Sequence, residues 1–105
     1  MEDTRCGGWS DPKSPISEEQ RICNELKQEV EYRTGKIYCV FTATLYISQV
    51  VAGVNKIIKV HVGEDDYIHV EVFVPLPCHG SKPQLTDVKT GFHKDSPFEI
   101  FKPKP

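Results

Sequence analysis

The sequence lacks a long apolar segment, and it carries almost no net charge. No run of about 18 apolar residues occurs, so we expect no membrane-spanning helix. The 13 basic and 15 acidic residues nearly cancel, to a net charge of -2, which gives no electrostatic attraction to nucleic acid or to an anionic membrane. The start, Met1–Arg5, is acidic and has no apolar stretch, so we expect no secretory signal and a cytoplasmic location.

Zinc-binding cysteine motifs are also missing. The cysteines are Cys6, Cys23, Cys39 and Cys78. They allow three disulfide pairings in an oxidising compartment, whereas free thiols are favoured in the cytosol. No two of them form a Cys-x-x-Cys knuckle, which excludes the usual zinc site.

Motifs for catalysis are absent as well. The chain contains no Gly-x-Ser-x-Gly, phosphate-binding loop or His-Glu-x-x-His. Cys78 and His79 are adjacent in the sequence, and adjacent side chains on an extended loop diverge instead of forming a nucleophile–base pair. His61 and His69 provide only two candidate metal ligands. We therefore expect no enzyme activity, no catalytic residues, no cofactor and no metal.

What is present is the pattern of one α+β domain over residues 1–105, with residues 1–14 as a mobile arm and residues 102–105 as a C-terminal extension. Ser14-Pro15 is typical of a helix N-cap followed by proline at the first helical position, and Ser17-x-x-Gln20 is typical of a capping box one turn later. Thr34-Gly35 predicts the end of the helix. The helical stripe between them is Ile22, Cys23, Leu26 and Val30.

Four runs with a period of two follow from Lys36, and they predict an antiparallel sheet of four to five strands packed on the helix. Val40 and Tyr46 are out of phase in the first run, which suggests a bulge. The last run ends near Gly91, and the tail from Phe92 is expected to trail off. The predicted core-facing residues of the first three runs are Ile37, Cys39, Phe41, Ala43, Leu45 and Ile47; Val54, Ile58, Val60 and Val62; and Ile68, Val70, Val72 and Val74.

The middle hairpin allows a register to be predicted. Facing residues share a face of the sheet, so the two even-numbered apolar sets must oppose each other. A loop over residues 63–67 then places Val62 opposite Ile68. The same register predicts three facing pairs on the exposed outer face: Lys59 with Glu71, Ile57 with Phe73, and His61 with His69.

The segment Gln49-Val50-Val51-Ala52-Gly53 is unusual because it is apolar where a hairpin turn is normally polar. An exposed apolar tip is typical of a contact surface. Leu76-Pro77 is a second apolar point, and in a meander the connection after the third strand lies at the same end of the sheet as this tip. Gly7-Gly8-Trp9 is a third, on an N-terminal arm that is able to reach that end. Together the three segments predict a binding wedge.

These residues resemble the cystatin family in its stefin, or type 1, form. Gln49–Gly53 matches the QxVxG signature as QVVAG, and Gly7-Gly8-Trp9-Ser10 is similar to the Gly-Gly-Leu-Ser start of the stefin arm. Further matches are Asn55, Ile58–Gly63, Tyr67–His69, Val72-Phe73 and Leu76-Pro77, and the similarity covers about residues 6–101.

The resemblance implies a cystatin-like fold and reversible, tight inhibition of papain-like cysteine proteases such as lysosomal cathepsins. The residues that it implies for the protease contact are Gly7, Gly8, Trp9, Gln49, Val50, Val51, Ala52, Gly53, Leu76 and Pro77. The alternative is a binding module on the same scaffold that does not inhibit. We expect mostly a monomer, with a domain-swapped dimer as a second form. The departures from the family pattern, at Trp9, Cys78-His79-Gly80 and Lys102–Pro105, concern target preference.

Overall fold

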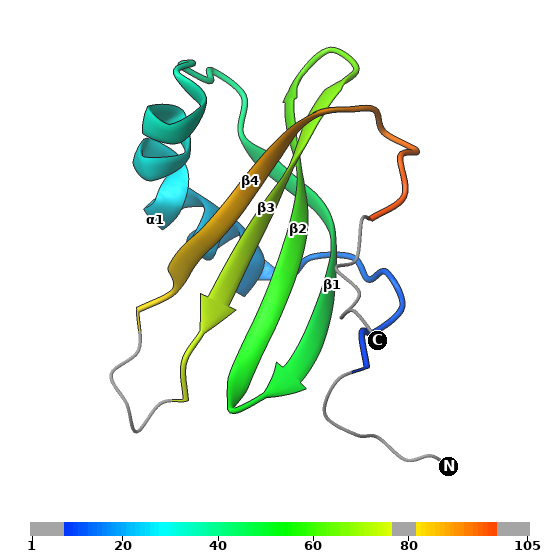
Figure 1. The fold of residues 1–105 in the computed structure, drawn as a ribbon. Coiled ribbons are helices and arrows are strands. Elements are labelled where there is room, and N and C mark those ends of the chain that lie inside the picture. Colours follow the sequence, from blue (N-terminus) through cyan, green and yellow to red (C-terminus); the bar gives the residue numbers. More distant parts are fainter. Residues whose placement is uncertain (1–7, 77–81, 99–105) are drawn as a thin grey trace, which may run out of the picture.

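The computed structural model describes residues 8–76 and 82–98, which form one helix and one sheet (Figure 1). The elements are α1 (Ser17–Thr34), β1 (Thr42–Val51), β2 (Gly53–Gly63), β3 (Asp66–Val74) and β4 (Gln84–Phe92). The strands are antiparallel and lie in the order β1-β2-β3-β4. The predicted α+β class, with one N-terminal helix on an antiparallel sheet, is confirmed. No helix among the described residues has the length and apolar character to cross a membrane.

Helix α1 begins two residues later than Pro15. Ile16 has extended backbone (φ -107°), and its N–H donates to the Glu19 carboxylate at 2.8 Å. Ser17 is therefore inside the helix and not its cap. The predicted end is confirmed, because Gly35 adopts the left-handed conformation (φ 74°) and donates its N–H to Glu31 O at 2.9 Å.

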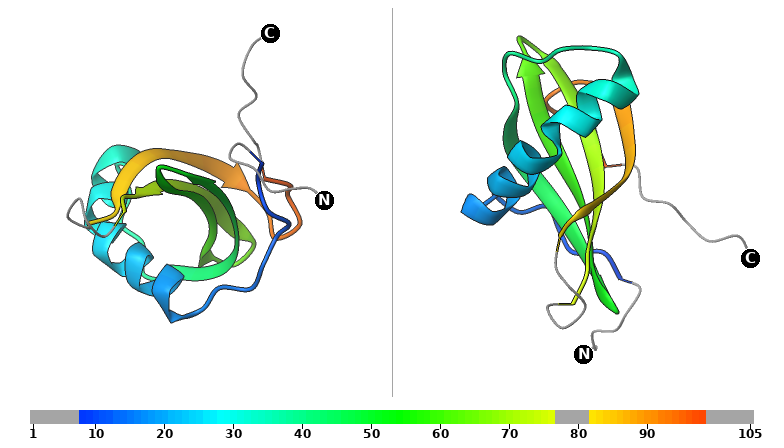
Figure 2. Two further views of the ribbon diagram at one scale, coloured as in Figure 1. Left: turned by 90° about the horizontal axis from the view of Figure 1, so that it is seen from below. Right: turned by 90° about the vertical axis from the view of Figure 1, so that its left-hand side faces the viewer.

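The main core lies between α1 and the inner face of the sheet, which curls toward the helix (Figure 2). The predicted helical stripe is buried there against the even-numbered residues of β2 and β3. The buried members are Ile22, Cys23, Leu26, Val30, Tyr38, Phe41, Ala43, Ile58, Val60, Val62, Ile68, Val70, Val72 and Leu85. Each methylene removed from water in such a core contributes about 0.8 kcal/mol to the free energy of folding. Packing of the helical stripe on the sheet therefore holds the two layers together.

Strand β1 starts later than the sequence predicts, and it contains the expected bulge. Ile37 is 82% exposed and Cys39 is also exposed, because residues 36–41 are an irregular connection and not a strand. The ladder shifts by one residue between Ala43 and Leu45. As a result Tyr46 faces the core opposite Ile58. Leu45 and Ile47, which the sequence places on the core face, lie on the outer face instead.

The predicted register of the β2–β3 hairpin is wrong by two residues. The even-numbered residues of the two strands still face each other, as predicted. Val60, and not Val62, lies opposite Ile68. The chain reverses over Glu64 and Asp65, where Gly63 and Glu64 take positive φ, so the turn is tighter than the predicted loop over residues 63–67. The facing pairs on the outer face are consequently Asn55 with Phe73, Ile57 with Glu71, Lys59 with His69, and His61 with Tyr67.

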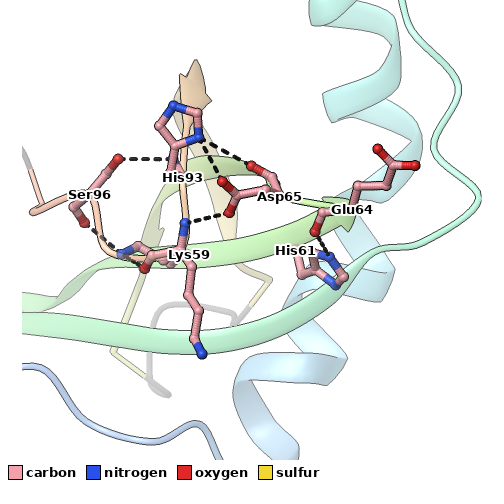
Figure 3. Close-up of polar contacts among 7 residues, drawn as sticks. Lys59, His61, Glu64, Asp65, His93 and Ser96 are labelled. Carbon is pink, nitrogen blue, oxygen red and sulfur yellow. Dashed lines mark hydrogen bonds and ion pairs between the residues drawn. The ribbon is translucent and has the colours of Figure 1, made fainter.

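The outer face is not exposed as predicted, because the tail after Phe92 folds back across it. We call residues 93–98 the C-terminal strap. Lys59 Nζ donates to Lys94 O at 2.8 Å and to Ser96 O at 2.6 Å (Figure 3). The ring of Phe98 stacks on His69 with centroids 4.9 Å apart, and His69 is only 1% exposed.

The strap is also tied to the β2–β3 turn. Asp65 receives the Lys94 backbone N–H at 3.3 Å, and His93 Nδ1 lies 3.1 Å from the Asp65 carboxylate (Figure 3). His93 in turn donates its backbone N–H to Ser96 Oγ at 2.9 Å. The strap therefore covers a second, smaller apolar layer on the face opposite the helix.

Candidate functional site

The apolar segment Gln49–Gly53, which we call the first loop, forms a tight turn between β1 and β2. Val50 pairs with Val54 and Val51 pairs with Gly53, so the ladder continues up to the tip at Ala52. Val50 is 62% exposed and Ala52 is exposed as well. An apolar tip is thus held in water by a paired backbone, which is the arrangement expected of a preformed contact.

Gly53 is required by this geometry. Its φ is 123°, which side chains rarely adopt, and a Cβ there would lie 2.7 Å from the backbone oxygen of Val74. Gln49 is fixed at the other end of the loop, since Asn55 Nδ2 donates to its side-chain oxygen at 2.9 Å. The shape of the first loop is therefore specified by its neighbours on both sides.

Of the predicted arm (residues 1–14), the structure describes residues 8–14, and residues 8–13 lie alongside β1. Trp9 forms an antiparallel bridge with Gln49, and Lys13 forms another with Tyr46. Between them the Ser10 N–H donates to Ser48 O at 2.8 Å. We call residues 8–13 the arm segment. Gly7, which the sequence also assigns to the contact, lies outside the described residues.

Trp9 does not project freely into water. It is half-buried and lines a cavity of about 420 Å³ on the outer face, together with Ile57 and Thr86. Trp9 therefore borders the outer face of the sheet, and its backbone stays next to the first loop.

The third predicted segment follows β3. Val74 pairs with Val54, close to the first loop, and Leu76 comes two residues later with 40% of its surface exposed. Pro77, with Cys78-His79-Gly80 after it, lies outside the described residues. The structure thus brings Trp9, the first loop and the end of β3 to one end of the sheet, opposite the β2–β3 turn (Figure 1).

A buried ion pair that the sequence reasoning missed supports this end of the sheet. Lys56 Nζ donates to Glu19 Oε2 at 2.6 Å, and Glu19 is only 1% exposed. Burial alone raises the pKa of Glu19, but its bonds from Lys56 and Ile16 outweigh burial and lower that pKa. The pair joins the first turn of α1 to β2, three residues after Gly53.

The described cysteines are both free thiols in different surroundings. Cys23 is fully buried, and burial, with Glu19 nearby, raises the pKa of its thiol to about 12. Cys39 is exposed, so its predicted position on the core face is wrong; the connection over residues 36–41 turns it outward. Within residues 8–76 and 82–98, no group of three His, Cys, Asp or Glu side chains is placed to hold a metal ion.

The comparisons with known proteins agree with this geometry. Residues 7–96 match the model of the cystatin domain. Cystatin-B of Oplegnathus fasciatus is 40% identical over 96 residues, which are 91% of this chain and 96% of that protein. Cystatin-A of Felis catus is 44% identical over 89 residues (85% and 91%), and stefin-C of Bos taurus is 45% identical over 85 residues (80% and 83%).

The chain therefore belongs to the cystatin family of cysteine proteinase inhibitors. Its relatives place it among the type 1 cystatins, or stefins. Cystatins are inhibitors and not enzymes, so the family membership confirms the expectation that this chain is not an enzyme.

Proposed function

We propose that this protein is a reversible, tight-binding inhibitor of papain-like cysteine proteases, including lysosomal cathepsins, and that it blocks the active-site cleft. The arm, the first loop and the segment Leu76-Pro77 enter the cleft side by side. The observation that carries the proposal is the pairing of Trp9 with Gln49, which joins the arm segment to the apolar loop.

Preorganisation supports tight binding. The first loop is paired up to Val51 and Gly53, and the arm segment is already bonded to β1, so little conformational entropy is lost at these two points. The exposed side chain of Val50 supplies apolar area that leaves water on binding. Inhibitor interfaces of this kind bury on the order of 1,600 Å².

The cross-strand pairs that close the first loop also account for an inhibitor that is not a substrate. A substrate must offer an extended peptide bond to the catalytic cysteine, whereas the first loop is closed by cross-strand pairs on both sides of Ala52. The wedge thus excludes substrate by occupying the cleft.

Membership among the type 1 cystatins, an intracellular group, supports a cytoplasmic location, which forms part of the proposal.

The test is a titration of papain with the full chain, read as residual hydrolysis of a small substrate. We expect loss of activity at a one-to-one ratio and recovery on dilution. Val51→Asp places a charge in the apolar contact and is expected to weaken inhibition roughly thirtyfold or more, the effect of losing a central contact residue.

The matched control is Ile37→Asp, which makes the same change at an exposed apolar residue away from the first loop. It should inhibit like the unmodified chain. Equal inhibition by the two variants would place the contact elsewhere on the molecule.

A further inference from the structure

A second concave site lies on the outer face of the sheet, away from α1. It is a cavity of about 550 Å³ between the arm segment and the C-terminal strap. Leu45, Ile47 and Lys59 form its floor on β1 and β2. Its two walls are residues 9–12 and 94–98, and Figure 2 shows these two chain segments on the side of the sheet away from the helix.

Half of the twelve lining residues are apolar, and two of these are aromatic rings. The apolar residues are Trp9, Pro12, Leu45, Ile47, Pro97 and Phe98. Small-molecule sites have volumes of roughly 300–1,000 Å³ and combine such a lining with a few polar groups. The cavity fits a ligand with a ring or a short hydrocarbon chain.

One buried charge distinguishes this floor. Lys59 is only 3% exposed, and two of the three N–H groups of its ammonium are used by Lys94 O and Ser96 O. Its other contact is the Phe98 ring, 5.4 Å away. In the part of the chain that the structure describes, all the direct contacts of this ammonium are thus with neutral groups.

The surroundings leave this positive charge poorly compensated. Burial lowers the pKa of Lys59, and the more distant Asp95 opposes that shift only in part. A buried cation without an anionic partner is costly, so an anion in the cavity gains a favourable partner. One further cation, Lys94, and two carboxylates, Asp11 and Asp95, also line the cavity, but all three are exposed to water, where their charges are screened. The two carboxylates disfavour ligands with more than one negative charge.

We propose that this cavity binds a small apolar monocarboxylate, with its hydrocarbon body between Trp9 and Phe98 and its carboxylate toward Lys59. The assignment follows from the shape and charge of this cavity and does not rest on the proposed inhibition, although Trp9 belongs both to the cavity wall and to the proposed protease contact.

The test is an NMR titration of the full isotopically labelled chain with naphthoate, in the absence of protease. Naphthalenemethanol and naphthylmethylamine serve as probes with the same ring system and a neutral or positive group. Naphthoate is expected to shift the Trp9 indole N–H and the amides of Leu45, Ile47 and Ser96. It should bind roughly ten- to a hundredfold more tightly than the alcohol, the range for a hydrogen bond to a charged group, and the amine should bind most weakly.

Two variants separate charge from shape. Lys59→Met is expected to remove the preference for the acid over the alcohol. Because that variant also loses two bonds to the strap, Leu45→Trp keeps Lys59 and fills the cavity; it should abolish binding of all three probes. Tyr32→Trp adds the same indole at a residue that is 88% exposed on α1 and should bind naphthoate normally.

Three results would overturn the proposal. They are equal affinity of the unmodified chain for the acid and the alcohol, no binding or shifts confined to other surfaces, and full naphthoate binding by Leu45→Trp.

Discussion

Ser10 and Ser48 bond to each other in both directions. The Ser10 N–H donates to Ser48 O at 2.8 Å, and the Ser48 N–H donates to Ser10 Oγ at 3.1 Å. This pair fixes the register of the arm segment on β1 and thereby sets Trp9 against Gln49. A wedge assembled before the protease arrives avoids part of the entropy cost of ordering the arm.

Ser10→Ala removes one of the two bonds and is expected to loosen the arm segment. A neutral hydrogen bond contributes about 0.5–1.5 kcal/mol, so dissociation from papain should become roughly two- to tenfold faster, with a smaller change in the association rate. Surface plasmon resonance measures both rates. Ser14→Ala, at an exposed residue outside the arm segment, is the control. Unchanged dissociation of the Ser10 variant would show that the bond does not hold the arm in the complex.

Gly53→Ala tests the close approach in the first loop. Alanine at a φ of 123° is strained, and its Cβ meets the backbone oxygen of Val74 at 2.7 Å. We expect the free energy of unfolding to fall by about 1–3 kcal/mol and protease affinity to fall as the loop shifts. Denaturant unfolding and inhibition titrations measure the two effects.

Gly35→Ala is the control for that prediction. It also has positive φ but meets no atom within 4 Å, and it ends the helix away from the first loop. It should lose some stability and keep full inhibition. A comparable loss of affinity in both variants would mean that global stability, and not the loop, controls binding.

The fold was largely predictable because its apolar periods are clear. The helical stripe of Ile22, Leu26 and Val30, and the glycine stop at Gly35, required only local patterning. The register of β2 against β3 could not be predicted in the same way. The alternation of side chains allows every second register, and the length and type of the turn select one of them. Glu64 takes a positive φ that its residue type does not suggest, so the tighter turn left no sequence signal.

The outer face shows a second limit of sequence reasoning. His69 lies between the rings of Phe92 and Phe98, at centroid distances of 3.8 and 4.9 Å. That contact depends on the strap folding back over the sheet, which no period in residues 93–98 indicates. The candidate contact residues were recognisable from the apolar first loop and the family signature. Ser48 and Lys56 carried no comparable signal, since polar residues on a strand are ordinary.

His69 should make stability depend on pH. Burial, and then the charges of Lys59 and Lys89, lower its pKa from 6.5 to about 4. Its two ring nitrogens are buried, and neither has a hydrogen-bond partner in the described part of the chain. The expected pair with His61 is therefore not the cause of this shift; desolvation is.

The direction of this pH dependence follows from how many protons the folded and the unfolded chain bind at His69. Above pH 6.5 neither state is protonated at His69; between 6.5 and 4 the unfolded chain binds a proton that the native state excludes. The free energy of unfolding should thus fall by about 2 kcal/mol between roughly pH 7 and pH 5, and level off below the folded pKa. Urea unfolding at the two pH values measures this change. His69→Phe keeps the stack without a titratable ring and should lose that part of the dependence; an identical slope would exclude His69 as its source.

Lys56→Met should reveal how strongly α1 depends on the buried ion pair. The substitution leaves the Glu19 carboxylate, 1% exposed, with the Ile16 N–H but without its cation. Breaking such a pair costs about 3–5 kcal/mol. The double variant Glu19→Leu, Lys56→Met removes both charges and should recover much of that stability. A double-mutant cycle compares the free energies of unfolding of the two single variants and the double variant. If the losses of the single variants simply add up in the double variant, the two side chains are not coupled.

The central claim is that an apolar wedge blocks the cleft without chemistry at the catalytic cysteine. It is tested most directly by measuring the affinity of this chain for papain whose active-site cysteine carries a small methylthio group. We predict that the inhibitor still binds one-to-one, remains uncleaved after prolonged incubation, and loses affinity when Val51→Asp is introduced. Complete loss of binding to the blocked enzyme, or cleavage within Gln49–Gly53, would contradict the wedge.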